Sequence, residues 1–162
     1  MTADGWTVAR TLVHDPVVVD LLRRYFTDVA SSFYGRPATD AEVTAALAED
    51  PSDDLVPPGG AFFVAHYQDI PAGCVGLRFG AAGFAELTRM FVTPEARGRG
   101  GSAVLLAVAE RHAKLGEAHT MRLETRLDLV AARRLYTKHG YRPIPAYSTG
   151  PFAECWYAKD LR

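Results

Sequence analysis

The stretch from residue 91 to residue 110 constrains this chain more than any other, because it joins an apolar run to a glycine loop and then to a helical pattern. Residues 97–102 read RGRGGS, and glycines let a backbone approach a ligand closely and point several N–H groups at one place. Ser102 is predicted to open an amphipathic helix, whose first N–H groups have no partner inside the helix. The sequence therefore predicts an anion site at a helix N-terminus, with Arg97 and Arg99 adding positive charge and forked donors.

Two common phosphate loops do not fit this stretch. A Walker loop needs a Gly-Lys pair followed by Ser or Thr, and no such pair follows the glycines. A dinucleotide-binding loop follows the first strand of a βαβ unit directly, whereas this loop lies past the midpoint of the chain in the wrong order of elements. A different class of phosphate site is therefore indicated.

The pattern Arg97-Gly98-x-Gly100-x-Ser102 resembles the pyrophosphate loop of the GNAT superfamily of acetyl-CoA-dependent acyltransferases, Arg/Gln-x-x-Gly-x-Gly/Ala. Upstream, residues 86–94 (ELTRMFVTP) resemble the central strand of that family. Downstream, residues 129–141 (LVAARRLYTKHGY) resemble its Asn-x-x-Ala-x-x-Leu-Tyr-x-x-x-Gly-Phe helix, with Leu129 in place of Asn. The resemblance covers roughly residues 61–158.

Length and composition indicate an ordinary globular protein. The chain has 162 residues, which suits a single domain over 1–162, here a GNAT-like acyltransferase domain. The formal net charge of −1 argues against a general nucleic-acid or membrane partner. Residues 1–5 show no secretory signal, and Cys74 and Cys155 are expected to be buried free thiols in a reducing cytoplasm. The histidines show no metal-ligand spacing, so no metal is expected, and His139 is interpreted as a helix-end charge.

The order of predicted elements indicates an α/β sandwich with a mixed, mostly antiparallel sheet of about seven strands and four helices. The predicted strands cover 6–12, 60–67, 73–79, 84–92, 120–125, 141–144 and 152–161. The predicted helices begin at Asp15-Pro16, at the capping box Thr39–Glu42, at Ser102 and after Asp128 as N-cap. The strands at 84–92 and 120–125 should run parallel, and in this family such a pair splays apart around the cofactor. The first helix should bury a stripe of apolar side chains: Val18, Leu21, Leu22, Tyr25, Val29 and Phe33.

The resemblance implies that acetyl-CoA is the cosubstrate and says which residues hold it. The pyrophosphate would bind the loop, and the pantetheine arm would lie against the main chain of the central strand. The later helix would lie beside the arm with Ala132 and Tyr136, and its Lys138 would lie at the mouth of the cofactor site. The complete predicted cofactor set is Met90, Phe91, Val92, Arg97, Gly98, Arg99, Gly100, Gly101, Ser102, Ala132, Tyr136 and Lys138.

Two residues are predicted to be catalytic. Glu86 aligns with the strand position that carries the general base in the histone-acetylating branch of the family, and an alkylammonium acceptor must lose a proton before it attacks. The alternative for Glu86 is an exposed strand acid in an ion pair with Arg78 or Arg89. Many members of the family use a water relay in place of a carboxylate base. Tyr136 stands at the family's Leu-Tyr position and would protonate the departing thiolate, or simply be a core aromatic.

The acceptor is interpreted as a small-molecule primary amine, attacked directly in a ternary complex. Tyr34, Arg89 and Tyr147 are the predicted substrate contacts, although Arg89 also suits a cross-strand ion pair. The alternatives are lysine or N-terminal acetylation of proteins and a non-catalytic acyl-CoA sensor. Dimers are frequent among similar proteins, so a homodimer is the assembly to test.

Overall fold

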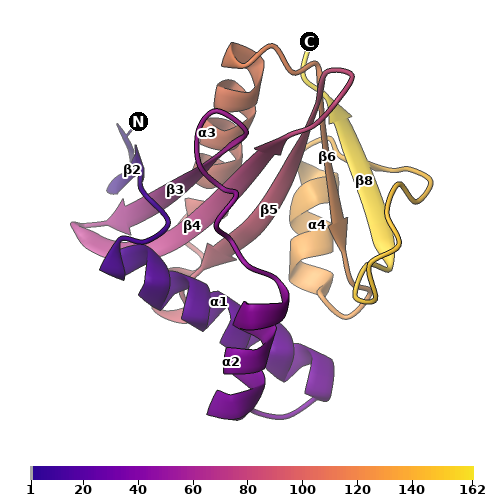
Figure 1. Ribbon diagram of the computed structural model, residues 1–162. Helices are drawn as coiled ribbons and strands as arrows, with labels where there is room; N and C mark the ends of the chain where they lie inside the picture. Colours follow the sequence, from indigo (N-terminus) through magenta and orange to yellow (C-terminus); the bar gives the residue numbers. More distant parts are fainter. Residues whose placement is uncertain (1) are drawn as a thin grey trace.

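The computed structural model describes residues 2–162 and shows one twisted sheet with helices on both faces (Figure 1). The sheet order is β1-β2-β3-β4-β5-β6-β8-β7, and every neighbouring pair is antiparallel except β5 and β6. The strands are β1 (Thr2–Ala3), β2 (Trp6–Arg10), β3 (Gly60–Tyr67), β4 (Ile70–Phe79), β5 (Phe84–Val92), β6 (Thr120–Thr125), β7 (Arg142–Pro143) and β8 (Cys155–Asp160). The predicted fold class is confirmed.

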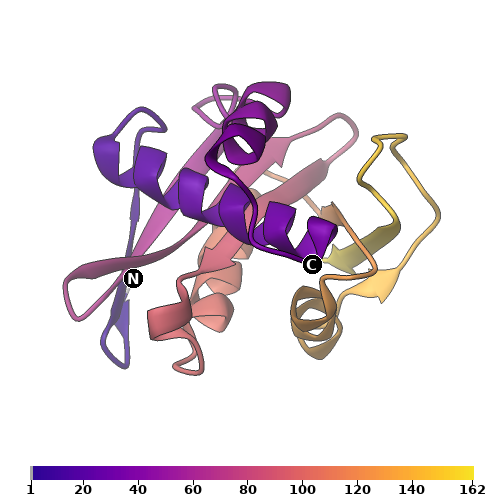
Figure 2. The same ribbon diagram turned by 90° about the horizontal axis from the view of Figure 1, so that it is seen from below.

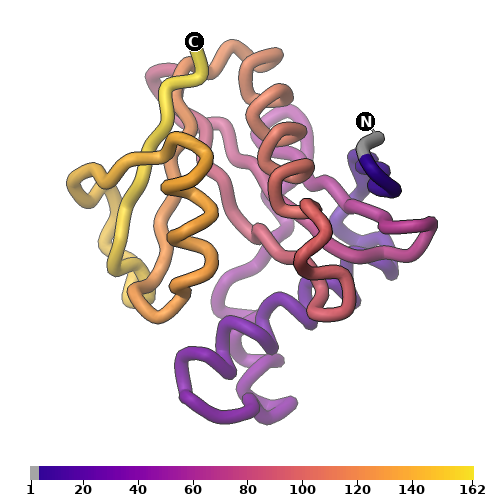
Figure 3. The backbone as a smooth tube through the Cα atoms, turned by 180° about the vertical axis from the view of Figure 1, so that it is seen from behind, coloured from indigo at the N-terminus to yellow at the C-terminus, as the bar shows by residue number. Residues whose placement is uncertain are grey.

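Four α-helices cover the two faces of the sheet. They are α1 (Pro16–Tyr34), α2 (Asp40–Glu49), α3 (Gly101–Leu115) and α4 (Val130–Lys138), and a short 3-10 helix, η1 (Pro94–Ala96), precedes α3. Viewed from below, α1 and α2 lie on one face of the sheet, and α3 and α4 lie on the other (Figure 2). From behind, α3 and α4 run side by side (Figure 3). No helix of residues 2–162 combines the length and apolarity that a bilayer crossing requires.

Local sequence signals set the ends of the first two helices as predicted. The Asp15 carboxylate accepts a hydrogen bond from the backbone N–H of Val17, and Gly35 ends α1 in the left-handed conformation with φ 68°. At α2, the Thr39 hydroxyl and the Glu42 carboxylate cap each other's backbone, which makes the full capping box. Both helix starts are therefore confirmed.

The predicted stripe of α1 is only partly right. Val18, Leu21 and Leu22 are buried, whereas Phe33 is 52% exposed. Its ring packs instead on Phe152, a residue of the loop between β7 and β8, with the ring centroids 5.3 Å apart. Periodicity alone predicted a buried face along the whole helix, but the last turn meets a loop and not the sheet.

Two other local predictions are wrong. Leu115 was expected to face the sheet, but it is 74% exposed at the end of α3. Asp128 was expected to cap α4, but Leu129 occupies the N-cap position and offers no side-chain hydrogen bond. The Asp128 carboxylate instead accepts hydrogen bonds from Arg126 (2.8 Å) and from Ser32 on α1. A stronger, charged partner therefore takes this carboxylate away from the helix.

Two apolar clusters fill the space between the helices and the sheet. The larger cluster lies under α3 and α4 and contains Leu105, Leu106, Met121 and Tyr136. The smaller lies under α1 and contains Leu21, Phe62, Cys74 and Phe91. Both cysteines are free; Cys74 is buried and Cys155 is half-buried, and burial raises the pKa of the Cys74 thiol to about 12. The sheet is thus fixed from both sides, which holds the ends of β5 and β6 in place.

Candidate active site

The predicted glycine loop forms a helix N-terminus with free donors. Gly98 and Gly100 adopt the left-handed conformation, with φ 77° and 83°. The helix α3 begins at Gly101, one residue earlier than predicted, and its first internal bond runs from the N–H of Val104 to the carbonyl of Gly100 (3.2 Å). The N–H groups of residues 101–103 therefore have no carbonyl one turn back to bond, and they are available to an anion.

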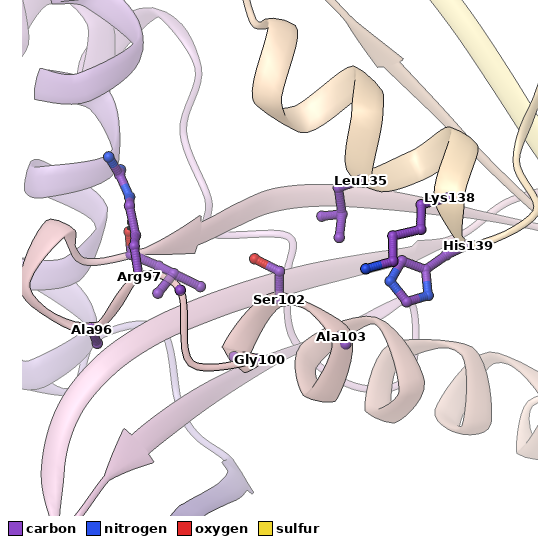
Figure 4. Close-up of a pocket in the computed structure, with 11 residues that line it drawn as sticks. Ala96, Arg97, Gly100, Ser102, Ala103, Leu135, Lys138 and His139 are labelled. Carbon is purple, nitrogen blue, oxygen red and sulfur yellow. Dashed lines mark hydrogen bonds between the residues drawn. The ribbon is translucent and has the colours of Figure 1, made fainter.

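A cavity of about 230 Å³ opens above these N–H groups (Figure 4). The loop and the start of α3 form one side, and Leu135, Lys138 and His139 from the end of α4 form the other. Six of the predicted cofactor residues in the strand and loop line it: Val92, Arg97, Gly98, Gly100, Gly101 and Ser102. Figure 4 shows Lys138 and His139 extending from α4 toward the first turn of α3. The cavity thus offers backbone donors on one wall and a basic pair on the other, which suits a phosphate group.

The sequence did not single out His139 for this cavity. It was read as a helix-end charge, and it does follow the last residue of α4. Its place on the cavity wall opposite the start of α3 depends on where the sheet holds α4 relative to α3. The available signal was its position within residues 129–141, the stretch that resembles the later helix motif of the family.

The two loop arginines hold the loop through contacts with neighbouring elements. The Arg97 Nε donates to the carbonyl of Val92 (3.0 Å), and its Nη2 lies 3.5 Å from the carboxylate of Asp28 on α1. The Arg99 guanidinium lies over the ring of Tyr67, 5.2 Å from its centroid. Arg97 still lines the cavity, whereas Arg99 is not among its lining residues. Direct contact of both guanidinium groups with a phosphate therefore remains a prediction.

Trp6, a residue of β2 for which the sequence predicts only a strand, shapes the loop from below. Its indole N–H donates to the carbonyl of Arg99 (2.8 Å), and its side chain is 1% exposed. A methyl group on Gly101 would lie 2.5 Å from this indole ring, so the helix can start here only with glycine. Contact between residues this far apart in sequence cannot be read from local pattern.

A wedge between β5 and β6 leads away from the cavity. The parallel pairing of the two strands covers three residues and ends at Glu86 opposite Arg122. Beyond that point β5 continues to Val92 beside β4, while β6 diverges from it (Figure 1). The edge of β5 that faces β6 is left without a strand partner there, and such backbone groups need a bonding partner. The wedge narrows at Glu86 and opens at Val92, beside the cavity.

A bulge in β5 accompanies the wedge. Thr88 pairs with Gly76 and Phe91 pairs with Cys74, so residues 89 and 90 together oppose one residue of β4. Arg89 has φ 56°, which is rare for a residue with a side chain. The bulge turns Phe91 toward α1, and Met90 and Val92 pack against the cluster under α3.

Arg89, predicted to contact the acceptor, is 3% exposed and is bound to the segment after α2. Its donors reach the Ser52 hydroxyl (3.1 Å), the Asp50 carbonyl (3.0 Å) and the Thr88 hydroxyl (2.8 Å). Its Nη2 also lies 3.2 Å from the Asp50 carboxylate. The guanidinium therefore holds the bulge against this segment, and a contact with substrate remains a prediction.

Tyr136 lies on the α4 side of the wedge. The side chain is buried, and its ring centroid is 5.7 Å from that of Tyr141 and 6.4 Å from that of Tyr157. Burial, and then the nearby Tyr25 on α1, raise the pKa of Tyr136, so its phenol is protonated at neutral pH. A protonated phenol can donate a proton. Ala132, also predicted to contact the cofactor, packs half-buried against the same cluster.

Glu86 lies at the narrow end of the wedge with both carboxylate oxygens bonded. Arg78 Nη1 donates to Oε1, and the Tyr147 hydroxyl donates to Oε2, each at 3.1 Å. The ion pair with Arg78 weighed for Glu86 in the sequence is therefore present. The structure also brings together Glu86 and Tyr147, which were predicted separately as base and substrate contact. Tyr34, by contrast, lies at the exposed end of α1 beside Phe33 and under the Arg36 guanidinium.

Known proteins share the sequence pattern of this chain. The model of the acetyltransferase (GNAT) family matches residues 18–141. An uncharacterized N-acetyltransferase of Schizosaccharomyces pombe is 32% identical over 129 residues, which are 78% of each chain.

Solved structures share the fold over nearly their whole length. The PaiA N-acetyltransferase of Thermoplasma acidophilum, in complex with coenzyme A, has a TM-score of 0.76 at 17% identity and covers 96% of this chain and 98% of its own. A GNAT-family acetyltransferase of Staphylococcus aureus has a TM-score of 0.76 at 17% identity, with 97% and 99% covered. From the family match and the relative, we conclude that the chain belongs to the GNAT family and is an acetyltransferase.

Proposed function

We propose that the protein transfers an acetyl group from acetyl-CoA to a primary amine of a small molecule, by direct attack within a ternary complex. One observation carries this proposal: the anion cavity at the start of α3 opens onto the wide end of the wedge, and Glu86 lies at its narrow end. A phosphate-bearing thioester held at the cavity would extend its arm toward Glu86. The coenzyme A in the Thermoplasma neighbour supports the same cosubstrate here.

The residues present suit the parts of acetyl-CoA. The free N–H groups of residues 101–103 with Lys138 and His139 would hold the pyrophosphate. The unpaired edge of β5 between Met90 and Val92 would bond the amides of the pantetheine arm, which must be satisfied when buried. A backbone N–H near Phe91 or Val92 would stabilise the negative charge that develops on the thioester oxygen.

Two side chains would move the protons. Glu86 would receive the proton of the acceptor ammonium, since its carboxylate lies where the strands separate. Tyr136 would give a proton to the departing thiolate, since its phenol carries a proton at neutral pH and lies on the α4 side of the wedge. This division of roles is typical of two titratable groups that lie in different environments.

A small acceptor is favoured by what covers Glu86. The loop from residue 144 to residue 154 lies over this part of the sheet, and two consecutive residues anchor it: Tyr147 to Glu86, and Ser148 to Glu124 and Trp156. Because this loop lies over the part of the sheet that carries Glu86, little room is left there for a folded protein partner. The competing acceptor is a peptide that enters the site as one extended segment.

The direct test is a thiol-release assay with acetyl-CoA and a panel of small amines and peptides, combined with mass spectrometry of the products. We expect acetylated small amines and a much slower reaction with peptides. Release of thiol with peptides only would replace the small-molecule assignment with protein acetylation. Tight binding of acetyl-CoA without turnover of any amine would identify a sensor.

A further inference from the structure

The Tyr147 hydroxyl donates to Oε2 of Glu86, the carboxylate oxygen that Arg78 does not hold. We propose that Tyr147 is a catalytic residue that passes the proton of the acceptor ammonium to Glu86. The inference rests on the proposed function, in which Glu86 is the final proton acceptor. It adds a group that contacts the substrate directly.

The two oxygens of Glu86 are held in different ways. Oε1 accepts from Arg78, whose guanidinium is itself fixed by Asp54, with Nε to Oδ2 at 2.6 Å and Nη2 to Oδ1 at 3.3 Å. This oxygen therefore faces a permanent cation on the β4 side. Oε2 accepts the Tyr147 hydroxyl at 3.1 Å. Tyr147 takes one lone pair of Oε2, so an ammonium group that approaches from the side of the phenol reaches this oxygen through the hydroxyl.

The surroundings of Tyr147 favour a phenol that stays in place. The Arg122 guanidinium lies 4.1 Å from the centroid of its ring, a cation–π contact on a half-buried residue. The next residue, Ser148, bonds the Glu124 carboxylate and accepts the indole N–H of Trp156 at 2.8 Å. The loop is thus tied to β5, β6 and β8 at two consecutive positions. Moving the phenol off Oε2 would break its bond to Glu86, whereas a transfer through the hydroxyl leaves the ring under Arg122 and the Ser148 bonds in place.

The chemistry of a phenol allows this passage. The Tyr147 oxygen donates its proton to Glu86 and keeps lone pairs that can accept an N–H from the ammonium. In the step, one N–H bond of the acceptor breaks and its proton joins the Tyr147 oxygen. The original Tyr147 O–H bond breaks at the same time, and that proton joins Oε2 of Glu86. The electron pair left on nitrogen then attacks the thioester carbonyl, so charge and atoms balance.

The electrostatic environment requires the two transfers to be concerted. Burial first, and then the carboxylates of Glu86 and Glu124, raise the pKa of Tyr147, while Arg122 opposes the shift. A free phenolate therefore does not accumulate, and the proton must leave Tyr147 as another arrives. The charged groups around the Glu86–Tyr147 pair come from β4, β6 and the segment after α2: Arg78, Arg122, Glu124 and Asp54.

The test compares Tyr147→Phe with the wild type on an amine that the wild type acetylates. Phenylalanine keeps the ring under Arg122 and removes only the hydroxyl. We expect kcat/KM for the amine to fall by about 10²-fold, the usual effect of a proton-transfer group. The Kd for acetyl-CoA should not change, because the phenol lies at the far end of the wedge from the cavity. The matched control is Ser148→Ala, which loosens the same loop but leaves the phenol, and it should keep most of the activity.

A double-mutant cycle with Glu86→Gln separates relay from simple binding. Residues that act as one unit lose activity non-additively, so the double variant should be about as slow as the slower single variant. The rate should also be measured in mixtures of H2O and D2O. Its dependence on the fraction of D2O should indicate two protons transferred in the rate-limiting step of the wild type and one in that of Tyr147→Phe.

Three outcomes would overturn the relay: a wild-type rate for Tyr147→Phe, fully additive losses, or a single proton in the wild type. If the wild type acetylates no amine at all, the proposed function itself fails. The two failures are therefore distinguishable.

Discussion

The indole N–H of Trp6 donates to the carbonyl of Arg99 at 2.8 Å, which joins the second strand of the sheet to the loop before α3. The same ring lies against Gly101, where an added methyl group would approach it to 2.5 Å. Trp6 therefore fixes both the path of the glycine loop and the first residue of the helix. Free N–H groups bind an anion well only if they are held in position beforehand.

Replacing Trp6 should weaken the loop more than the sheet. We expect Trp6→Phe to lower the free energy of unfolding by about 1–2 kcal/mol, because one hydrogen bond is lost and the smaller ring leaves part of the indole's space empty. Affinity for coenzyme A should fall several-fold because the loop becomes mobile. Calorimetric titration and urea unfolding measure the two effects. Tyr67→Phe, which removes the weaker 3.4 Å bond from Arg99, is the control and should change affinity little.

Gly100→Asp should abolish binding of coenzyme A. Gly100 has φ 83°, so any side chain is strained there, and a carboxylate would repel the phosphates at the cavity. Gly59→Asp makes the same change of charge at a position where an added Cβ meets nothing within 4 Å, and it should bind normally. Unchanged affinity of the Gly100 variant would contradict the assignment of the cavity.

Tyr136→Phe should lower kcat by about 10²-fold while leaving the affinity for acetyl-CoA nearly intact, because a general acid acts on the transition state. Single-turnover kinetics and equilibrium binding separate the two quantities. Tyr157→Phe is the matched control, since this buried phenol lies in the same aromatic cluster and bonds Arg133 at 3.3 Å. Full activity of the Tyr136 variant would remove its role as acid.

Glu86→Gln should slow the reaction by about 10²-fold at a pH below the pKa of the acceptor amine, where a base must take the proton. The difference from the wild type should narrow as pH rises and free amine becomes abundant. Rates measured across pH with one amine test this. Glu124→Gln, which alters the neighbouring carboxylate on β6, should show no such pH-dependent gap. A rate that is equal to the wild type at every pH would exclude Glu86 as base.

Acid should loosen the junction between α1 and the loop before α4. The Arg126 guanidinium, with the Ser32 hydroxyl, holds the pKa of Asp128 at about 2, below its ordinary value. Because the folded-state pKa is lowered, the stabilisation is present above the unfolded value of about 4 and is lost as pH falls toward 2. The partial exposure of this pair limits the effect to about 1 kcal/mol or less. Thermal unfolding of Asp128→Asn should show a smaller loss of stability over this pH range than the wild type.

Much of the fold followed from local patterns because the signals were local. The capping box at Thr39, the Asp15-Pro16 helix start and the strands at 60–67, 84–92 and 120–125 appear where predicted. The misses at Phe33 and Leu115 share one cause: what lies opposite the last turn of the helix decides its burial, and periodicity carries no information about that. Asp128 differs, because the nearby Arg126 guanidinium binds the carboxylate that was predicted to cap α4.

The sequence by itself determined the glycine loop, the helix it opens and the family pattern around them. These depend on backbone freedom and on unpaired N–H groups within a few residues of one another. Only the tertiary structure decided that Trp6 supports the loop, that His139 joins Lys138 at the cavity and that Tyr147 bonds Glu86. Those contacts join segments far apart in the chain, and their geometry exists only once the sheet and both helical layers have packed.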